Sequence, residues 1–450
     1  MALRDRAAHG RRLLDRSLFP EPVPSTPAPP RWERASVAAA LVALGVVLQL
    51  ARIGWDASVN ALWAEDGAIF LQDALTQGFG EAVGREYSGY LVLVPRLIGE
   101  LATLVPLEAA AAAVSILSAI LVALCGLAVW HAAAAHIPNP YLRGALVLAT
   151  VLTPVGGLES IDSASYVSWY MLFAVFWILL WRPRTFASAA WGALLVAATV
   201  LSNPGVWFLL PLAILRALAI RDRRDATIVG AYYGASAIQL AAMLGSGYES
   251  TNPLWTADIW ATLLQRVVDG AVLGVRLGGG IWDELGWPYL IAVTLTVVVA
   301  FAVGLARGDA RARAFALVAL PTAIGMFVIS VYQRAVGTLM LWPEGTHGAN
   351  AGRYAIVPVL IVISAAMVVA ERQRRPQGNH PLWPAAALVA LVLVSVAVAL
   401  PAGYSAARGD TGWDAALDQA AVDCANDPNG YATFPTSPPF SMTLPCSLIP

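Results

Sequence analysis

The chain has no lysine, and only 13% of its 450 residues are charged. All 28 basic residues are arginine, which we interpret as a codon-bias trait of a GC-rich bacterium and not as a functional feature. The sequence also lacks His-x-x-x-His and Cys-x-x-Cys spacings and a GxxxxGK(S/T) phosphate loop. It has no basic surface interleaved with aromatic residues, so we do not expect nucleic acid as a partner.

Long apolar stretches are abundant in the sequence. Hydrophobic residues make up 58% of the chain, and stretches long enough to cross a bilayer recur along almost all of it. We therefore predict an all-α polytopic membrane protein with about 11 transmembrane helices surrounded by membrane lipids. The expected spans are 36–54, 108–130, 142–157, 166–181, 187–202, 204–220, 226–244, 288–306, 313–331, 354–370 and 382–401.

The charge distribution predicts the orientation in the membrane. Residues 1–34 are rich in arginine and proline and have no early apolar core, so we expect a disordered cytoplasmic tail and an uncleaved first span. The membrane domain, 35–401, then leaves residues 402–450 outside a bacterial plasma membrane. On this topology the inner segments hold 20 arginines and 8 acids, and the outer segments hold 8 arginines and 21 acids. That asymmetry is the one that orients membrane proteins.

Two apolar segments are predicted not to span. Residues 90–105 carry Pro95, Arg96 and Glu100 at their centre, which would be costly at bilayer depth. We expect this segment, and likewise residues 262–280, to lie as interfacial helices in the first and fourth outer loops.

The cysteines divide into two kinds. Cys125 lies in an apolar run and is most simply a small core residue. Cys424 and Cys446 lie in the polar stretch after the last span, where two cysteines in a short exposed segment predict a disulfide. We expect a small cap, clipped by that bond, over the outer face.

The most informative motif is Glu65-Asp66-Gly67, directly after the first span. Two adjacent carboxylates at a membrane surface suit a general base, a cation site or a partner for arginine. The simpler alternative is a pair of solvated loop acids. The second outer loop adds two more acids close to the membrane, Glu159 and Asp162.

Arginines in the outer segments are candidates for binding an anion. Arg334 and Arg353 flank the fifth outer loop at the ends of spans, against the local positive-inside preference. Arg96 lies in the 90–105 segment, where it could equally extend its side chain towards lipid headgroups. His347 and Tyr354 are further candidates in the fifth loop.

This arrangement resembles the GT-C superfamily, integral-membrane glycosyltransferases that take a sugar from a polyprenyl-phosphate carrier on the outer side. The sequence Trp63-Ala-Glu65-Asp66-Gly67 matches the acidic motif that this superfamily carries after its first span. Glu159 and Asp162 match its acidic position in the second outer loop. The resemblance covers roughly 36–401. It departs from many members at the C-terminus, where about fifty residues follow the last span in place of a large soluble domain.

The resemblance implies transfer of a sugar to a cell-envelope glycan or lipid with inversion at the anomeric carbon. Asp66 or Glu65 would be the base, and Glu159 or Asp162 would position the acceptor or a cation. Arg96, Arg334 and Arg353 would hold the donor phosphate. A divalent cation, Mg²⁺ or Mn²⁺, stays open. The alternatives are a lipid or polysaccharide transporter, which needs ionisable residues within its spans, and a non-catalytic membrane protein for envelope assembly.

Overall fold

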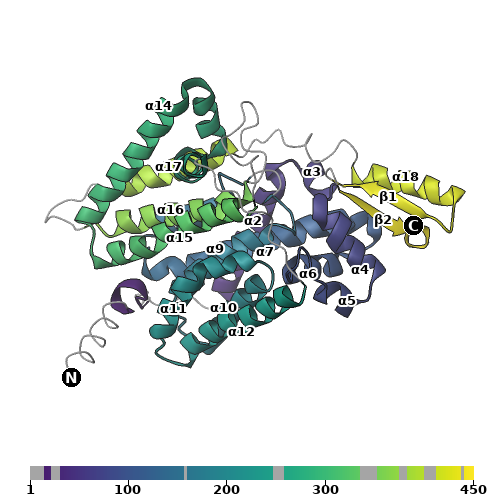
Figure 1. Ribbon diagram of the computed structural model, residues 1–450, viewed down its shortest axis with the longest axis horizontal. Helices are drawn as coiled ribbons and strands as arrows, with labels where there is room; N and C mark the ends of the chain where they lie inside the picture. The colour runs from purple at the N-terminus through teal and green to yellow at the C-terminus, as the bar shows by residue number, and fades with distance from the viewer. Residues whose placement is uncertain are drawn as a thin grey trace.

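The computed structural model describes residues 15–21, 31–156, 160–246, 258–334, 352–373, 383–399, 412–436 and 440–449. Helices dominate these residues (Figure 1). The longer ones are α2 (Arg31–Arg52), α7 (Ala110–Ala132), α8 (Pro140–Val151), α9 (Val167–Leu180), α10 (Phe186–Val200), α11 (Leu210–Leu218) after the 3-10 turn η5 (Pro204–Leu209), α12 (Arg223–Gly245), α14 (Gly270–Arg307), α15 (Ala310–Arg334), α16 (Arg353–Glu371) and α17 (Trp383–Ala399).

Every predicted span coincides with one of these helices. Six described segments are long and apolar enough to cross a membrane: Ala35–Arg52, Leu107–Ala135, Arg223–Gly245, Ile259–Arg307, Ala310–Gln333 and Arg353–Glu371. Five shorter apolar helices accompany them: Pro140–Val151, Val167–Leu180, Phe186–Val200, Pro204–Leu218 and Ala386–Ala399. The chain is therefore a largely helical, multi-pass membrane protein. The count of eleven spans stays a prediction.

Helix α9 forms the centre of the bundle. Every residue from Val167 to Leu180 is buried, as expected of a helix that is apolar on all sides. Helices α7, α10 and α16 pack against it. Its first residues therefore hold a fixed position at the end of the bundle where the acidic motif lies.

The loop between α2 and α7, which keeps the name of the predicted first outer loop below, is built from short helices. They are α3 (Trp55–Val59), the π-helix η1 (Asp66–Leu71), α4 (Gln72–Thr76), α5 (Phe79–Gly84), α6 (Leu93–Ala102) and the 3-10 turn η2 (Leu107–Ala109). Helix α6 has ten residues, a length of about 15 Å, which is half of what the hydrocarbon core requires. The 90–105 segment therefore does not span as one helix, and its place at the interface stays a prediction.

Residues 262–280, which we predicted to form an interfacial helix, are helical in the structure and are built from several pieces. They comprise the end of α13 (Asp258–Leu263), the π-helix η6 (Leu264–Asp269) and the start of α14. Helix α14 then continues to Arg307, with non-helical backbone at Gly274 (φ 69°) and Gly286 (φ 55°). Glycine adopts positive φ without steric cost, so the chain bends at these two residues, and Gly286 separates 262–280 from the span predicted at 288–306. The interfacial position of 262–280 stays a prediction.

Part of the tail that we predicted to be disordered is folded. Leu18 and Phe19 are buried at 1% and 0% exposure. Asp15 forms ion pairs with Arg182 and Arg221, and the guanidinium of Arg182 lies over the Phe19 ring at 5.8 Å. The prediction was wrong for 15–21 because two apolar side chains in an arginine-rich tail find partners far along the chain.

The C-terminal segment is a helix and a hairpin. Helix α18 (Trp413–Asn426) packs on β1 (Tyr431–Pro435), which pairs antiparallel with β2 (Ser441–Pro445) ahead of the 3-10 turn η9 (Cys446–Leu448). The predicted disulfide is present and joins Cys424 to Cys446 across a Cα–Cα distance of 5.3 Å.

This segment docks on the first outer loop. Trp413 donates its indole N–H to the Leu107 carbonyl at 2.9 Å and its backbone N–H to the Asn60 carbonyl at 2.8 Å. The backbone N–H of Thr443 donates to Gln72 Oε1 at 2.6 Å. Figure 1 shows α18 and the hairpin beside α3 and α4, at the end of the molecule away from residues 15–21. The cap and the acidic motif therefore share one end.

Candidate functional site

The acidic motif lies at a sharp change of backbone direction. Ala64 has a positive φ of 34°, and the Asp66 N–H bonds the Trp63 carbonyl at 2.7 Å. The π-helix η1 begins at Asp66, and such wide turns occur frequently at functional sites. The turn places Glu65 and Asp66 in different surroundings although they are adjacent in sequence.

Gly67 allows the C-terminal segment to approach the motif. A Cβ atom at this position would lie 2.8 Å from Thr436 Cγ2 and 3.2 Å from Leu62 Cδ1. The motif therefore needs glycine because the segment after β1 lies directly against it.

Asp66 is buried and tied to the loop between α8 and α9, the predicted second outer loop. Its side chain accepts from the Ala164 N–H at 3.0 Å, from the Ser165 N–H at 2.8 Å and from the Ser165 hydroxyl. Burial raises the pKa of Asp66 to about 6, although the Ser165 hydrogen bonds oppose that rise. With 1% of its surface exposed and both oxygens engaged, Asp66 fixes the position of residues 164–165.

Glu65 is half-buried and faces two tyrosines. Its Oε1 accepts from the Tyr87 hydroxyl and its Oε2 from the Tyr166 hydroxyl, both at 3.4 Å. Burial and the charge of Glu65 raise the pKa of Tyr87 to about 12. Tyr87 therefore stays a neutral donor at working pH. Hydrogen bonds of this length are weak, and Glu65 is the member of the pair that can exchange its partners for a substrate.

Arg353 and Glu65 both contact the side chain of Tyr166. Its guanidinium carbon lies 5.1 Å from the Tyr166 ring centre and 4.8 Å from that of Tyr354. Arg353 also donates to the Tyr354 hydroxyl at 3.4 Å, and Tyr354 packs edge-on against Trp169 at 5.4 Å. The fold thus brings a carboxylate from the first outer loop and a guanidinium from the start of α16 to one aromatic ring.

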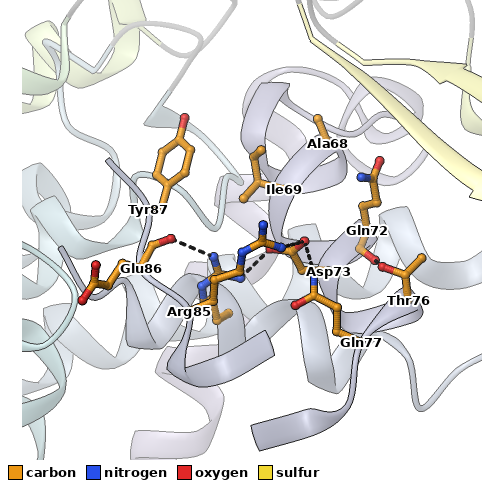
Figure 2. A pocket seen from close by; sticks show the side chains of 10 residues that line it. Ala68, Ile69, Gln72, Asp73, Thr76, Gln77, Arg85, Glu86 and Tyr87 are labelled. Atoms are coloured by element: carbon orange, nitrogen blue, oxygen red, sulfur yellow. Dashed lines mark hydrogen bonds and ion pairs between the residues drawn. The ribbon is translucent and has the colours of Figure 1, made fainter. Parts of the chain in front are cut away.

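Arg96 lies elsewhere in the first outer loop. It is 2% exposed, and its guanidinium pairs with Asp73 at 2.9 Å and lies 5.7 Å from the Phe70 ring centre. Arg85 pairs with the same carboxylate at 3.0 Å. These residues line a cavity of about 320 Å³, shown in Figure 2. The charge of Arg96 is already met by Asp73, which does not favour the phosphate role that we predicted for it.

The other predicted site residues divide in two. Asp162 is 4% exposed, has a positive φ of 49° and accepts from the Ser58 hydroxyl at 3.0 Å, so it ties the second outer loop to α3. Glu159, His347 and the side chain of Arg334 lie outside the described residues. Within the described ranges, no three His, Cys, Asp or Glu side chains gather as a metal site.

The sequence interpretation did not identify Tyr166 and Ser165 as site residues. Both residues follow Asp162 in the second outer loop, directly before α9. Their polar side chains next to an acidic stretch were the signal that could have marked them as site residues. Only the fold shows that Tyr166 contacts both Glu65 and Arg353.

No protein-family model matches this chain, and no curated protein matches its sequence. Among solved structures, the chain is similar to one determined by single-particle cryo-EM and described as arabinofuranosyltransferase AftD from Mycobacteria. The sequence identity is 17% and the TM-score is 0.49. The similarity covers 88% of this chain and 29% of that chain, so this chain spans less than a third of the length of the protein it matches.

Proposed function

We propose that this protein is a membrane glycosyltransferase that moves a sugar from a polyprenyl-phosphate carrier to a cell-envelope glycan or lipid, with inversion. The observation that carries the proposal is that one tyrosine, Tyr166, contacts both Glu65, through its hydroxyl, and Arg353, through its ring. One residue can accept a proton and the other can hold a phosphate. The resemblance of the acidic motif to that of the GT-C superfamily supports the same reading.

Glu65 is the proposed base. In the reaction, the acceptor oxygen bonds to the anomeric carbon while the bond from that carbon to the phosphate oxygen breaks. The electron pair of the broken bond leaves with the phosphate, and the hydroxyl proton goes to Glu65, which later returns it to water. A lipid phosphate is a good leaving group, so this step needs no general acid. A single displacement inverts the configuration.

Asp66 is the proposed positioning residue. A base must reach the proton that it removes, and both Asp66 oxygens are engaged by Ala164 and Ser165. Because Tyr166 follows Ser165 directly, Asp66 holds the tyrosine that Glu65 and Arg353 share.

The arrangement of the two ends supports the proposed orientation, with the N-terminus cytoplasmic and the C-terminus outside. The acidic motif and the cap lie at one end of the molecule (Figure 1). The folded part of the tail pairs with Arg182 and Arg221 at the other. Cytoplasmic ends of membrane proteins are enriched in arginine.

The direct test reconstitutes the purified protein in nanodiscs with a series of polyprenyl-phosphate sugars and alkyl glycoside acceptors. We expect one donor to release polyprenyl phosphate together with a glycosylated acceptor. Labelled lipid that crosses a vesicle bilayer without release of polyprenyl phosphate would support the transporter instead.

Arg353→Ala is expected to raise the KM for the donor about tenfold or more, because a hydrogen bond to a charged group contributes roughly 1.5–3 kcal/mol. Arg353→Lys should fall between this variant and wild type, since lysine keeps the charge but not the planar stacking on Tyr166. Initial rates against donor concentration measure both effects. Arg307→Ala, which removes an exposed arginine at the end of α14, is the matched control. A donor KM unchanged in Arg353→Ala would remove Arg353 from the phosphate site.

A further inference from the structure

The cavity in the first outer loop is lined by η1, α4, residues 85–87 and Arg96 of α6. It has a volume of about 320 Å³, at the lower end of the range of small-ligand sites, roughly 300–1,000 Å³. Figure 2 shows polar side chains gathered around it. The lining residues are Ala68, Ile69, Gln72, Asp73, Thr76, Gln77, Arg85, Glu86, Tyr87 and Arg96.

The charges of this cavity balance. Asp73 accepts from Arg96 at 2.9 Å, from Arg85 at 3.0 Å and from Gln77 at 2.9 Å. Glu86 is the second acid of the lining, and its carbonyl accepts from Arg96 at 3.5 Å. An anion would meet the carboxylates of Asp73 and Glu86, and a cation would meet both arginines. The charge pattern therefore favours a neutral ligand.

The lining offers both donors and acceptors at the surface of the cavity. The Arg85 side chain is 55% exposed, and the amides of Gln72 and Gln77 and the hydroxyl of Thr76 lie along α4 and its end. Amides and hydroxyls can both donate and accept, as a ligand with several hydroxyl groups requires. A neutral sugar has this chemistry.

Tyr87 connects the cavity to the proposed base. It lines the cavity, and its hydroxyl donates to Glu65 Oε1. The other carboxylate oxygen, Oε2, contacts Tyr166, on the side where Arg353 stacks. Inversion requires the attacking hydroxyl and the leaving phosphate to lie on opposite sides of the anomeric carbon. With phosphate on the Tyr166 side, the acceptor approaches from the Tyr87 side.

We propose that this cavity binds a neutral, hydroxyl-rich sugar of the acceptor, next to the sugar whose hydroxyl reacts. The assignment as an acceptor site rests on the proposed function. Arg96 is then a wall of the acceptor site, held there by Asp73, and Arg85 is the residue at its open edge that contacts the sugar.

Two variants test the site in complementary ways. Arg85→Ala removes an exposed hydrogen-bonding group, and Thr76→Trp places a large side chain in the cavity from an exposed position on α4. The probes are alkyl glycosides of one to three neutral sugars and an alkyl phosphate of the same chain length. Their binding to protein in nanodiscs is measured by titration calorimetry. Thermal melting confirms that each variant is folded.

We expect the dissociation constant for the glycosides to rise about tenfold in Arg85→Ala, the effect of losing one hydrogen bond to a charged group. It should rise at least as much in Thr76→Trp, because the indole ring occupies the space of the sugar. Arg223→Ala, an exposed arginine at the start of α12, should bind them as wild type does. Unchanged glycoside binding in both Arg85→Ala and Thr76→Trp would overturn the proposal. Tighter binding of the alkyl phosphate at this site would also overturn it.

A second readout separates this proposal from the proposed function. In the transfer assay, both cavity variants should raise the KM for the acceptor and leave the KM for the donor unchanged. Transfer with an unaltered acceptor KM would reject the cavity as the acceptor site and keep the transferase. Glycoside binding that the variants weaken, in a protein that transfers nothing, would keep the sugar site and reject the transferase.

Discussion

Glu65→Gln is expected to lower the kcat of sugar transfer by about 100-fold to 10,000-fold, the range that a general base contributes. The amide has nearly the shape of the carboxylate and can still accept from one of the two tyrosines that contact Glu65, so the fold should persist. Removal of the base should leave donor binding largely intact. Initial rates with saturating donor and acceptor measure this effect.

The matched control is Glu81→Gln, an exposed glutamate on α5 in the same outer loop. It removes the same charge from the same face of the membrane and should transfer at the wild-type rate. A Glu65→Gln enzyme within a few-fold of wild type would show that Glu65 is not the base. If Asp66→Asn then had the larger effect on kcat, the roles of the two acids would be exchanged.

Sequence periodicity and composition were enough to locate the membrane helices. Apolar runs depend on short-range pattern, and each of the predicted runs falls on a helix. The position of the acidic pair directly after the first predicted span could also be predicted from the sequence, since it depends only on where α2 ends. The Cys424–Cys446 bond followed from two cysteines in one short polar segment and is present.

The contacts that distinguish the candidate site residues from one another could not be predicted from the sequence. Arg96 and Arg353 looked equivalent as outer arginines, but one pairs with Asp73 and the other stacks on Tyr166. Their difference depends on tertiary contacts that no local pattern encodes. For Arg353, the contact that matters joins the starts of α16 and α9.

The split between Glu65 and Asp66 has the same origin. Adjacent residues at the start of a π-helix point in different directions, so one is buried against residues 164–165 and the other faces Tyr87 and Tyr166. The folding of residues 15–21 could not be predicted because Asp15 pairs with Arg182 and Arg221, which are far away in the sequence.

Asp66 is expected to make the stability of the protein depend on pH between about 4 and 6. Burial raises its pKa in the folded chain from 3.8 to about 6. Below about pH 3 the carboxyl is protonated in both the folded and the unfolded chain. As the pH rises towards 6, the unfolded chain releases the proton while the folded chain keeps it, so the free energy of unfolding falls. A shift of about two units corresponds to about 3 kcal/mol.

Asp66→Asn cannot titrate and isolates this contribution. The free energy of unfolding of wild type minus that of the variant should fall by about 3 kcal/mol from about pH 3 to about pH 8. Denaturant titration in mixed micelles at each pH measures it. Asp418→Asn, which removes an exposed carboxylate from α18, should give a curve parallel to that of wild type. If the free energy of unfolding of wild type minus that of Asp66→Asn rose with pH, the hydrogen bonds to Asp66 would outweigh the effect of its burial on the pKa.

The same variant also tests the positioning role. Asparagine offers one acceptor oxygen where Asp66 offers two, so either the Ala164 or the Ser165 N–H loses its partner. Residues 164–165 should then shift and carry Tyr166 with them, which disturbs the stacking of Arg353. We therefore expect Asp66→Asn to raise the donor KM as Arg353→Ala does, and Glu65→Gln to act mainly on kcat. This difference between KM and kcat is the kinetic signature of one carboxylate that holds the site and another that takes the proton.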